Sequence, residues 1–296
     1  MSGALVRRAR GAGRMLLSGD RLDRLAALHH LGRVTFAGAP ARALLARADG
    51  RERYAAMQRA VYESAALADA DGVRAGALGG DHVVGSWRAH DAWADYEDFL
   101  MRDVPATPVW TALDFGCGPG RNIRRWSGRF ARIDGADIAQ ANLDNARVFL
   151  AGLPAEQQPR LYLTRGDDCG DAPSGAYDFV FSTIALQHIC VHAVRARIFE
   201  DMLRCLRPGG RLSVQMGFGV PSPMTVGYFA DHVDAPATNR ACDVAIASPE
   251  QPRGTLERAG FVDFEHWLRP AGPGDVHPRW IFFTARRPLG DPPAAR

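Results

Sequence analysis

The stretch Leu113-Asp114-Phe115-Gly116-Cys117-Gly118-Pro119-Gly120 decides the fold of this chain. Two apolar residues flank an acid, and three glycines then alternate with other residues. A short apolar run that ends in glycines is typical of a strand that turns sharply into a helix. The free N–H groups at the start of that helix would face any ligand that the loop approaches. We therefore predict a strand, a ligand-binding loop and a helix at this point.

The same alternation continues through the rest of the chain. From Val109 onward, short apolar runs bounded by Gly, Asp and Pro alternate with amphipathic segments. Strands joined in this way by helices form a parallel, doubly wound sheet with helices on both faces. We expect strands at residues 109–115, 132–137, 161–165, 177–182, 210–216, 261–268 and 279–286, and helices at 120–130, 139–153, 193–206 and 249–259.

Two regions differ from this pattern. Residues 20–100 place apolar side chains at three- and four-residue spacing and have few strand-like runs, which predicts a helical N-terminal region. Residues 218–248 contain Pro221, Pro223 and Pro236, which predicts an inserted lid or substrate loop. We expect a helical region or lid over 1–100 and a main α/β domain over 101–290.

Composition excludes several classes of function. The chain of 296 residues is 47% hydrophobic and 23% charged, with a net charge of +3 that is not gathered into one block. This gives no argument for nucleic acid as a partner, and no apolar run is long enough to span a membrane. All 36 basic residues are arginine, so a catalytic lysine or lysine Schiff base is excluded.

The cysteines predict free thiols. Cys117, Cys169, Cys190, Cys205 and Cys242 are odd in number and form no C-x-x-C pair. They fall mostly within expected strands, helices or the glycine loop, which favours buried thiols in a reducing compartment over disulfides or zinc. We expect a cytoplasmic protein.

Acidic residues at the ends of three successive strands indicate the kind of ligand. Asp114 lies two residues before the first glycine of a G-x-G-x-G pattern, where a carboxylate would repel a diphosphate but accept hydrogen bonds from an ammonium group. Asp137, 21 residues beyond Gly116, is placed to accept both hydroxyls of a ribose. Asp167 and Asp168 follow the third strand and could pair with an adenine edge.

Five motifs in this order resemble the class I S-adenosylmethionine-dependent methyltransferase family. They read L-D-F-G-C-G-P-G-R-N, I-D-G-A-D-I, R-G-D-D, Y-D-F-V-F-S-T-I-A-L-Q-H-I and L-R-P-G-G-R-L. The resemblance implies a sheet of seven strands with the last antiparallel and S-adenosylmethionine as cofactor; a dinucleotide-binding domain is the alternative. The expected cofactor-binding residues are Asp114, Gly116, Cys117, Gly118, Gly120, Asp137, Ile138, Asp167, Asp168 and Thr183.

His188 is the best placed candidate for a general base, because it lies just past the fourth strand. A histidine there could also only cap the loop or pack under the cofactor, and His232 and His277 are rival candidates. The end of that strand, Ser182-Thr183-Ile184-Ala185, has no carboxylate to hold a metal ion. We therefore expect methyl transfer without a metal.

Acceptor recognition is expected from the insertion and the N-terminal region, which mix aromatic and short polar side chains. This mixture suits a small molecule or glycan that carries a hydroxyl group. Alternatives are N- or C-methylation of a metabolite, a non-catalytic cofactor-binding scaffold and, less favoured, aminopropyl transfer; a homodimer is one option for the oligomeric state. The candidate acceptor-binding residues are Trp87, Tyr228, His232, Asn239 and His277.

Overall fold

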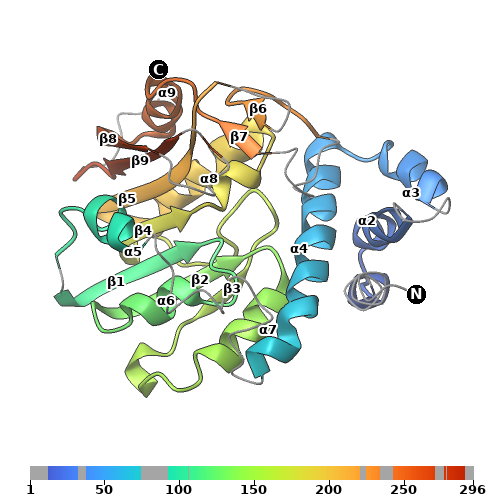
Figure 1. Ribbon diagram of the computed structural model, residues 1–296, viewed down its shortest axis with the longest axis horizontal. Coiled ribbons are helices and arrows are strands. Elements are labelled where there is room, and N and C mark those ends of the chain that lie inside the picture. Colours follow the sequence, from blue (N-terminus) through green and yellow to red (C-terminus); the bar gives the residue numbers. More distant parts are fainter. Residues whose placement is uncertain are drawn as a thin grey trace.

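The computed structural model describes residues 13–32, 38–74, 93–105, 107–220, 225–233, 243–270, 277 and 279–290. A seven-stranded sheet in the order β3-β2-β1-β4-β5-β9-β8 forms its centre (Figure 1). Strands β1 to β5 pair in parallel, and β9 pairs antiparallel with both β5 and β8. The predicted fold class is confirmed. The strands are β1 (Thr107–Phe115), β2 (Phe130–Asp137), β3 (Leu161–Leu163), β4 (Tyr177–Thr183), β5 (Leu206–Phe218), β8 (Val262–Pro270) and β9 (Arg279–Arg286).

Helices cover both faces of the sheet because successive strand residues point to opposite sides. In β4, Val180 belongs to one buried apolar cluster, whereas its neighbours Phe179 and Phe181 belong to another. The first cluster includes residues of α8 (His192–Cys205) and α9 (Glu250–Ala259). The second includes residues of α6 (Arg121–Trp126), α7 (Gln140–Phe149) and η1 (Tyr96–Leu100).

The N-terminal helices extend one side of the molecule. Helix α4 (Gly50–Arg74) runs beside α7, and α2 (Arg21–Gly32) and α3 (Gly38–Leu45) lie on its outer side (Figure 1). The buried Glu63 carboxylate of α4 accepts a hydrogen bond of 3.0 Å from the N–H of Ala141, in the first turn of α7. Asn145 of α7 donates in return to the Ala66 carbonyl oxygen at 2.8 Å. These bonds fix α4 against the sheet domain. Short elements complete the order: α5 (Trp93–Asp95), η2 (Ala155–Gln157) and η3 (Leu186–His188).

The insertion contains two strands that the sequence did not predict. Strands β6 (Thr225–Gly227) and β7 (Asp243–Ala245) pair in parallel as a separate small sheet. Ile246, directly after β7, forms a bridge with Phe218 at the end of β5. This bridge brings the start of β7 to the carboxyl edge of the large sheet.

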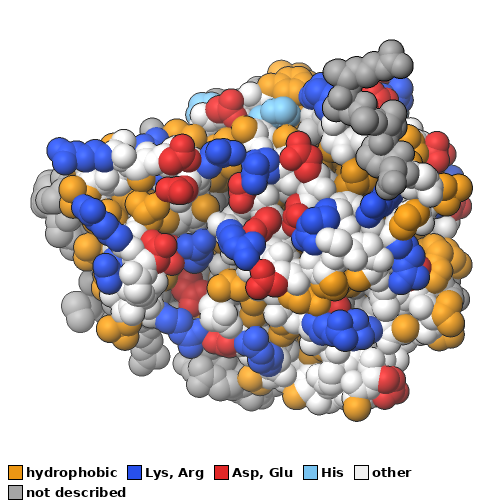
Figure 2. Space-filling model, turned by 180° about the vertical axis from the view of Figure 1, so that it is seen from behind, with side chains coloured by type: hydrophobic (Ala, Val, Ile, Leu, Met, Phe, Trp, Pro, Cys, Tyr) orange, Lys and Arg blue, Asp and Glu red, His pale blue; other side chains and the backbone are white. Residues whose placement is uncertain are grey.

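No helix in the described part of the chain is long and apolar enough to cross a membrane. On the face drawn in Figure 2, arginine and acidic side chains are interspersed. That face therefore has a mixed charge pattern.

Candidate functional site

The glycine loop after β1 forms the floor of a cavity of about 480 Å³. Gly116 and Gly118 have φ of 73° and 53°, which side chains other than glycine rarely adopt. A β-carbon on Gly116 would lie 2.3 Å from the β-carbon of Ala185, so this glycine permits close packing of β1 against β4. A β-carbon on Gly118 would meet nothing within 4 Å, so this stretch of backbone borders open space.

Asp114 lies beneath the loop, with no exposed surface. Neither of its carboxylate oxygens has a hydrogen-bond partner among the residues that the structure describes. Burial raises the pKa of this carboxyl well above its usual range, although the nearby Arg121 guanidinium acts in the opposite direction. A buried carboxylate without a partner is costly, and an ammonium group would supply the missing donors.

Asp137, at the end of β2, fixes the loop in place. Its Oδ2 accepts from the N–H of Gly118 at 2.9 Å, and its Oδ1 accepts from the N–H of Ala139 at 2.8 Å and the amide of Asn142 at 3.1 Å. Burial raises the pKa of Asp137, and these hydrogen bonds oppose the shift. Because each carboxylate oxygen can accept two hydrogen bonds, Oδ2 retains capacity for one ligand hydroxyl.

The segment after β4 turns sharply to bring His188 to the cavity. Ile184 has a φ of 63°, which a β-branched residue rarely adopts, and the chain enters η3 directly afterwards. The imidazole Nδ1 of His188 lies 2.6 Å from Oδ1 of Asp243, at the start of β7. The other oxygen, Oδ2, lies 3.3 Å from Nε2 of His277. Two rival histidines of the sequence analysis therefore share one carboxylate.

Asp243 remains ionised over a wide pH range. Burial acts to raise its pKa, but hydrogen bonds from His188 and His277 outweigh burial and hold the pKa well below its usual value. The ring of His277 is buried against the backbone of β5, since a β-carbon on Gly217 would lie 2.2 Å from the ring. Asp243 was missed in the sequence, where it is a lone acid before the apolar run 244–246.

Helix α4 forms the opposite wall of the cavity. Gln58 donates to the carbonyl oxygen of His188 at 3.1 Å, and Tyr54 donates to the same oxygen at 3.3 Å. The Tyr54 hydroxyl accepts from the N–H of Cys190 at 2.6 Å. Tyr54, Gln58 and Tyr62 all line the cavity. Their spacing of four residues on one helix face was the signal for these contacts, and the sequence analysis did not use it.

The full wall draws on five segments that are far apart in sequence. It consists of Tyr54, Gln58, Tyr62, Ala65 and Ala66 of α4, Phe115 to Pro119 with Arg121 and Asn122, Asp137, Ile138, Asn142 and Asn145, Thr164 and Gly166, and Thr183, Ile184, Ala185, His188 and Ile189. Sequence reasoning also missed Arg121, although it follows the last glycine of the loop directly.

Comparisons with known proteins agree with this geometry. A family model described as "Methyltransferase domain" matches residues 113–214. The trans-aconitate 2-methyltransferase of Methylobacterium radiotolerans is 32% identical over 210 residues, which are 65% of this chain and 75% of that protein. The chain belongs to the class I S-adenosylmethionine-dependent methyltransferase family. The trans-aconitate 2-methyltransferase of Azoarcus sp. (strain BH72) is 32% identical over 121 residues, but these are only 40% of this chain and 43% of that relative.

A solved structure shows the same fold. Geranyl diphosphate C-methyltransferase from Streptomyces coelicolor A3(2), crystallised with S-adenosyl-L-homocysteine, matches with a TM-score of 0.51 and 18% identity. The match covers 72% of this chain and 84% of that protein. S-adenosylmethionine is the cofactor of this family, and the unpartnered carboxylate of Asp114 fits the ammonium group of that cofactor.

The structure brings only part of the predicted cofactor set to the cavity. Gly116, Cys117, Gly118, Asp137, Ile138 and Thr183 line it. Asp114 and Gly120 do not; Asp114 is buried beneath the loop, and a β-carbon on Gly120 would lie 2.6 Å from Leu150. Asp167 instead pairs with Arg197 at 2.7 Å, and Asp168 pairs with Arg165 at 2.7 Å. Thr164 and Gly166 reach the wall from that segment, so the adenine contacts of Asp167 and Asp168 stay a prediction.

The predicted acceptor-binding residues are scattered. Tyr228 is buried beside the guanidinium of Arg195, which lies 4.9 Å from its ring centre, and it is not among the cavity residues. His232 is exposed and also lies away from the cavity wall. His277 reaches the site only through Asp243. Trp87 and Asn239 lie outside the described residues.

Proposed function

We propose that this chain is an S-adenosylmethionine-dependent O-methyltransferase that acts on a hydroxyl group of a small molecule or glycan. The observation that carries the proposal is the contact of 2.6 Å between Nδ1 of His188 and Asp243 beside the cofactor cavity. When Nδ1–H donates to a carboxylate, Nε2 is left as a proton acceptor. A hydroxyl acceptor needs such a base, because its own pKa is far above neutral.

One group of residues would bind the cofactor, and a second group would act on the acceptor. Bound S-adenosylmethionine supplies an activated methyl group on a sulfonium centre. Asp114 and Arg121 would hold the ammonium and carboxylate of its amino acid end, and Asp137 would accept from its ribose. His188 takes the hydroxyl proton of the acceptor, and Asp243 stabilises the imidazolium that results. Helix α4 forms one wall of this part of the site.

A carboxylate acceptor is the second candidate, and the names of the relatives favour it. A carboxylate is already ionised at neutral pH and needs no general base. However, Arg121 is the one arginine among the described cavity residues, and Asp137 offsets its charge. A tricarboxylate such as trans-aconitate would find little positive charge in the described wall, so we rank this function below hydroxyl methylation.

One pair of experiments tests the proposal. Calorimetry with S-adenosylhomocysteine establishes cofactor binding. Transfer of a labelled methyl group is then measured with phenols, sugars and trans-aconitate, for the wild type, His188→Ala and a control, His232→Ala. Hydroxyl methylation predicts labelled phenol or sugar products and a loss of roughly 100-fold or more in His188→Ala only. Labelled trans-aconitate that is insensitive to His188→Ala would replace the proposal by carboxylate methylation.

A further inference from the structure

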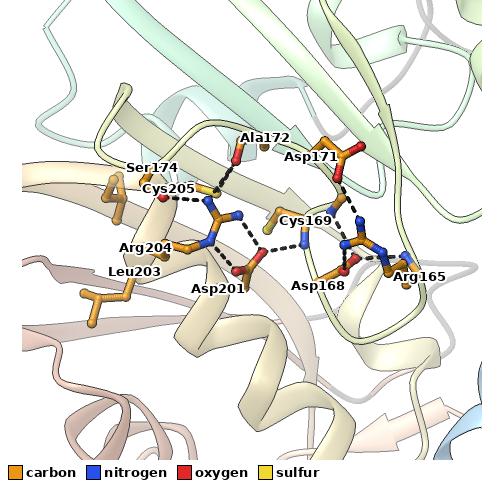
Figure 3. Close-up of polar contacts among 12 residues, drawn as sticks. Arg165, Asp168, Cys169, Asp171, Ala172, Ser174, Asp201, Leu203, Arg204 and Cys205 are labelled. Atoms are coloured by element: carbon orange, nitrogen blue, oxygen red, sulfur yellow. Dashed lines mark hydrogen bonds and ion pairs between the residues drawn. The ribbon is translucent and has the colours of Figure 1, made fainter.

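A second cluster of reactive side chains lies outside the cofactor cavity, where the loop after β3 meets the end of α8. The sulfur atoms of Cys169 and Cys205 and a carboxylate oxygen of Asp201 all lie within 4.8 Å of one another. Asp201 and Cys205 are four residues apart on α8, so they share one helix face. Figure 3 shows both side chains beside Cys169, which comes from the loop.

We propose that Cys169, Asp201 and Cys205 form a binding site for a soft divalent metal ion of the zinc class. Cysteine sulfur and aspartate oxygen are both zinc ligands, and a water molecule can complete a tetrahedron with these three donors. Zinc–sulfur bonds of about 2.3 Å at tetrahedral angles place the two sulfur atoms about 3.8 Å apart. From 4.8 Å, the sulfur–sulfur pair would need to close by no more than about 1 Å and each sulfur–oxygen pair by no more than about 1.3 Å.

Hydrogen bonds from surrounding groups already orient the Asp201 carboxylate, as is usual for carboxylates that ligate a metal ion. Arg204 donates from Nε to Oδ1 at 2.5 Å and from a terminal nitrogen to Oδ2 at 3.0 Å. The N–H of Cys169 also donates to Oδ2, at 2.8 Å. A carboxylate has about four acceptor positions, so one remains for a metal ion. The ion therefore need not displace Arg204.

The charges of the site balance when the metal ion binds. Each thiol releases one proton to solvent, so that two thiolates and the Asp201 carboxylate carry three negative charges. The dication and the Arg204 guanidinium together neutralise them. The adjacent Cys205 thiol and burial hold the pKa of Cys169 well above its usual range, and a bound dication reverses this effect by favouring the thiolate.

A polar hollow beside the cluster gives the ion access. It has a volume of about 440 Å³ and is lined in part by Gly170, Ser174, Asp201 and Arg204. Because Cys169 and Cys205 have no exposed surface, the ion would reach Asp201 first. The sequence favoured free thiols over zinc, because the two thiols are 36 positions apart and meet only in the fold. A bound ion would hold the loop after β3 against α8. The start of this loop, at Thr164 and Gly166, lines the cofactor cavity.

Metal titration of the full chain tests this site. The reduced, chelator-treated protein is titrated with Cd²⁺ while the thiolate-to-cadmium absorption is recorded, and Zn²⁺ is then added as competitor. We expect one equivalent in the wild type, no thiolate–cadmium absorption in the double variant Cys169→Ser/Cys205→Ser, and binding weakened at least about tenfold in Asp201→Asn. The control Asp171→Asn, whose carboxylate faces the same hollow, should bind like the wild type.

A second measurement guards against variants that fail to fold. Cys190 is a buried cysteine outside the cluster, so Cys190→Ser serves as the control. Zn²⁺ should raise the Tm of the wild type and of this variant by the same amount. It should not raise the Tm of Asp201→Asn to that extent. Absence of a thiolate–cadmium band in the wild type, or an unchanged band in the double cysteine variant, overturns the proposal. Neither result bears on methyl transfer.

Discussion

Replacing Asp114 by asparagine is expected to weaken cofactor binding while stabilising the cofactor-free fold. The carboxylate has no exposed surface, and neither oxygen has a hydrogen-bond partner in the described part of the chain. A hydrogen bond between charged groups contributes about 1.5–3 kcal/mol, so its loss should raise the Kd for S-adenosylhomocysteine by roughly 10- to 150-fold. The ammonium group would then meet a neutral amide in place of a carboxylate.

The gain in stability follows from the raised pKa of Asp114. Because the folded state binds the proton more tightly than the unfolded state, stability falls as the pH rises from the usual carboxyl range toward the raised value. Near neutral pH, Asp114→Asn removes this loss, which we put at about 1 kcal/mol or more. For a chain of this size, the Tm should rise by about 2 °C or more.

Calorimetry with S-adenosylhomocysteine and thermal melts of the cofactor-free protein measure the two effects. Asp178→Asn is the matched control. The Asp178 carboxylate is also buried, but it accepts from the N–H of Thr111 at 2.7 Å and pairs with Arg207 at 2.8 Å. This variant should lose stability and keep its cofactor affinity. An unchanged Kd in Asp114→Asn would refute the ammonium contact assigned to Asp114.

Three further changes test other parts of the site. Gly118→Ala should cost about 1–2 kcal/mol of stability from its positive φ and lower the affinity for S-adenosylhomocysteine further by contact with the ligand, as melts and calorimetry would show. Asp243 has a lowered pKa, so it stabilises the fold above its usual pKa of 3.8, and this contribution is lost as the pH falls toward the lowered value. Asp243→Asn should therefore flatten the dependence of Tm on pH in the acid range; an unchanged acid slope would contradict the ion pairs. Gly217→Ala places a β-carbon 2.2 Å from the His277 ring, so turnover should fall while calorimetry still detects the cofactor.

The central strands of the sheet were predictable from sequence because they are buried on both faces. All seven residues of β4 are buried, and its centre, Phe179-Val180-Phe181, reads as a continuous apolar run. Strand β9 begins and ends at the predicted residues, 279 and 286. Strands β6 and β7 were not predicted because each has three residues and pairs with a distant segment. A run that short carries no periodicity of its own.

The same distinction, between local pattern and long-range packing, separates the site residues that were predictable from those that were not. The placement of Asp137 and His188 at the cavity follows from strand order, since the carboxyl ends of parallel strands meet at one edge of a sheet. Gln58 and Asp243 reach the site from α4 and from the insertion, whose docking depends on long-range packing. The ion pair of Asp167 likewise depends on Arg197, 30 positions further along the chain, which approaches only after folding. Local sequence patterns do not contain this information.

The position of α4 has a consequence for the turnover cycle. This helix is fastened at both ends of the cavity, by Glu63 to the first turn of α7 and by Gln58 to the carbonyl oxygen of His188. We expect that opening these bonds together widens the path by which spent cofactor leaves. The lifetime of the product complex would then depend more on the undocking of this helix than on the strength of the ligand contacts. Product release through this conformational change would be the slowest step of each cycle and would precede the next methyl transfer.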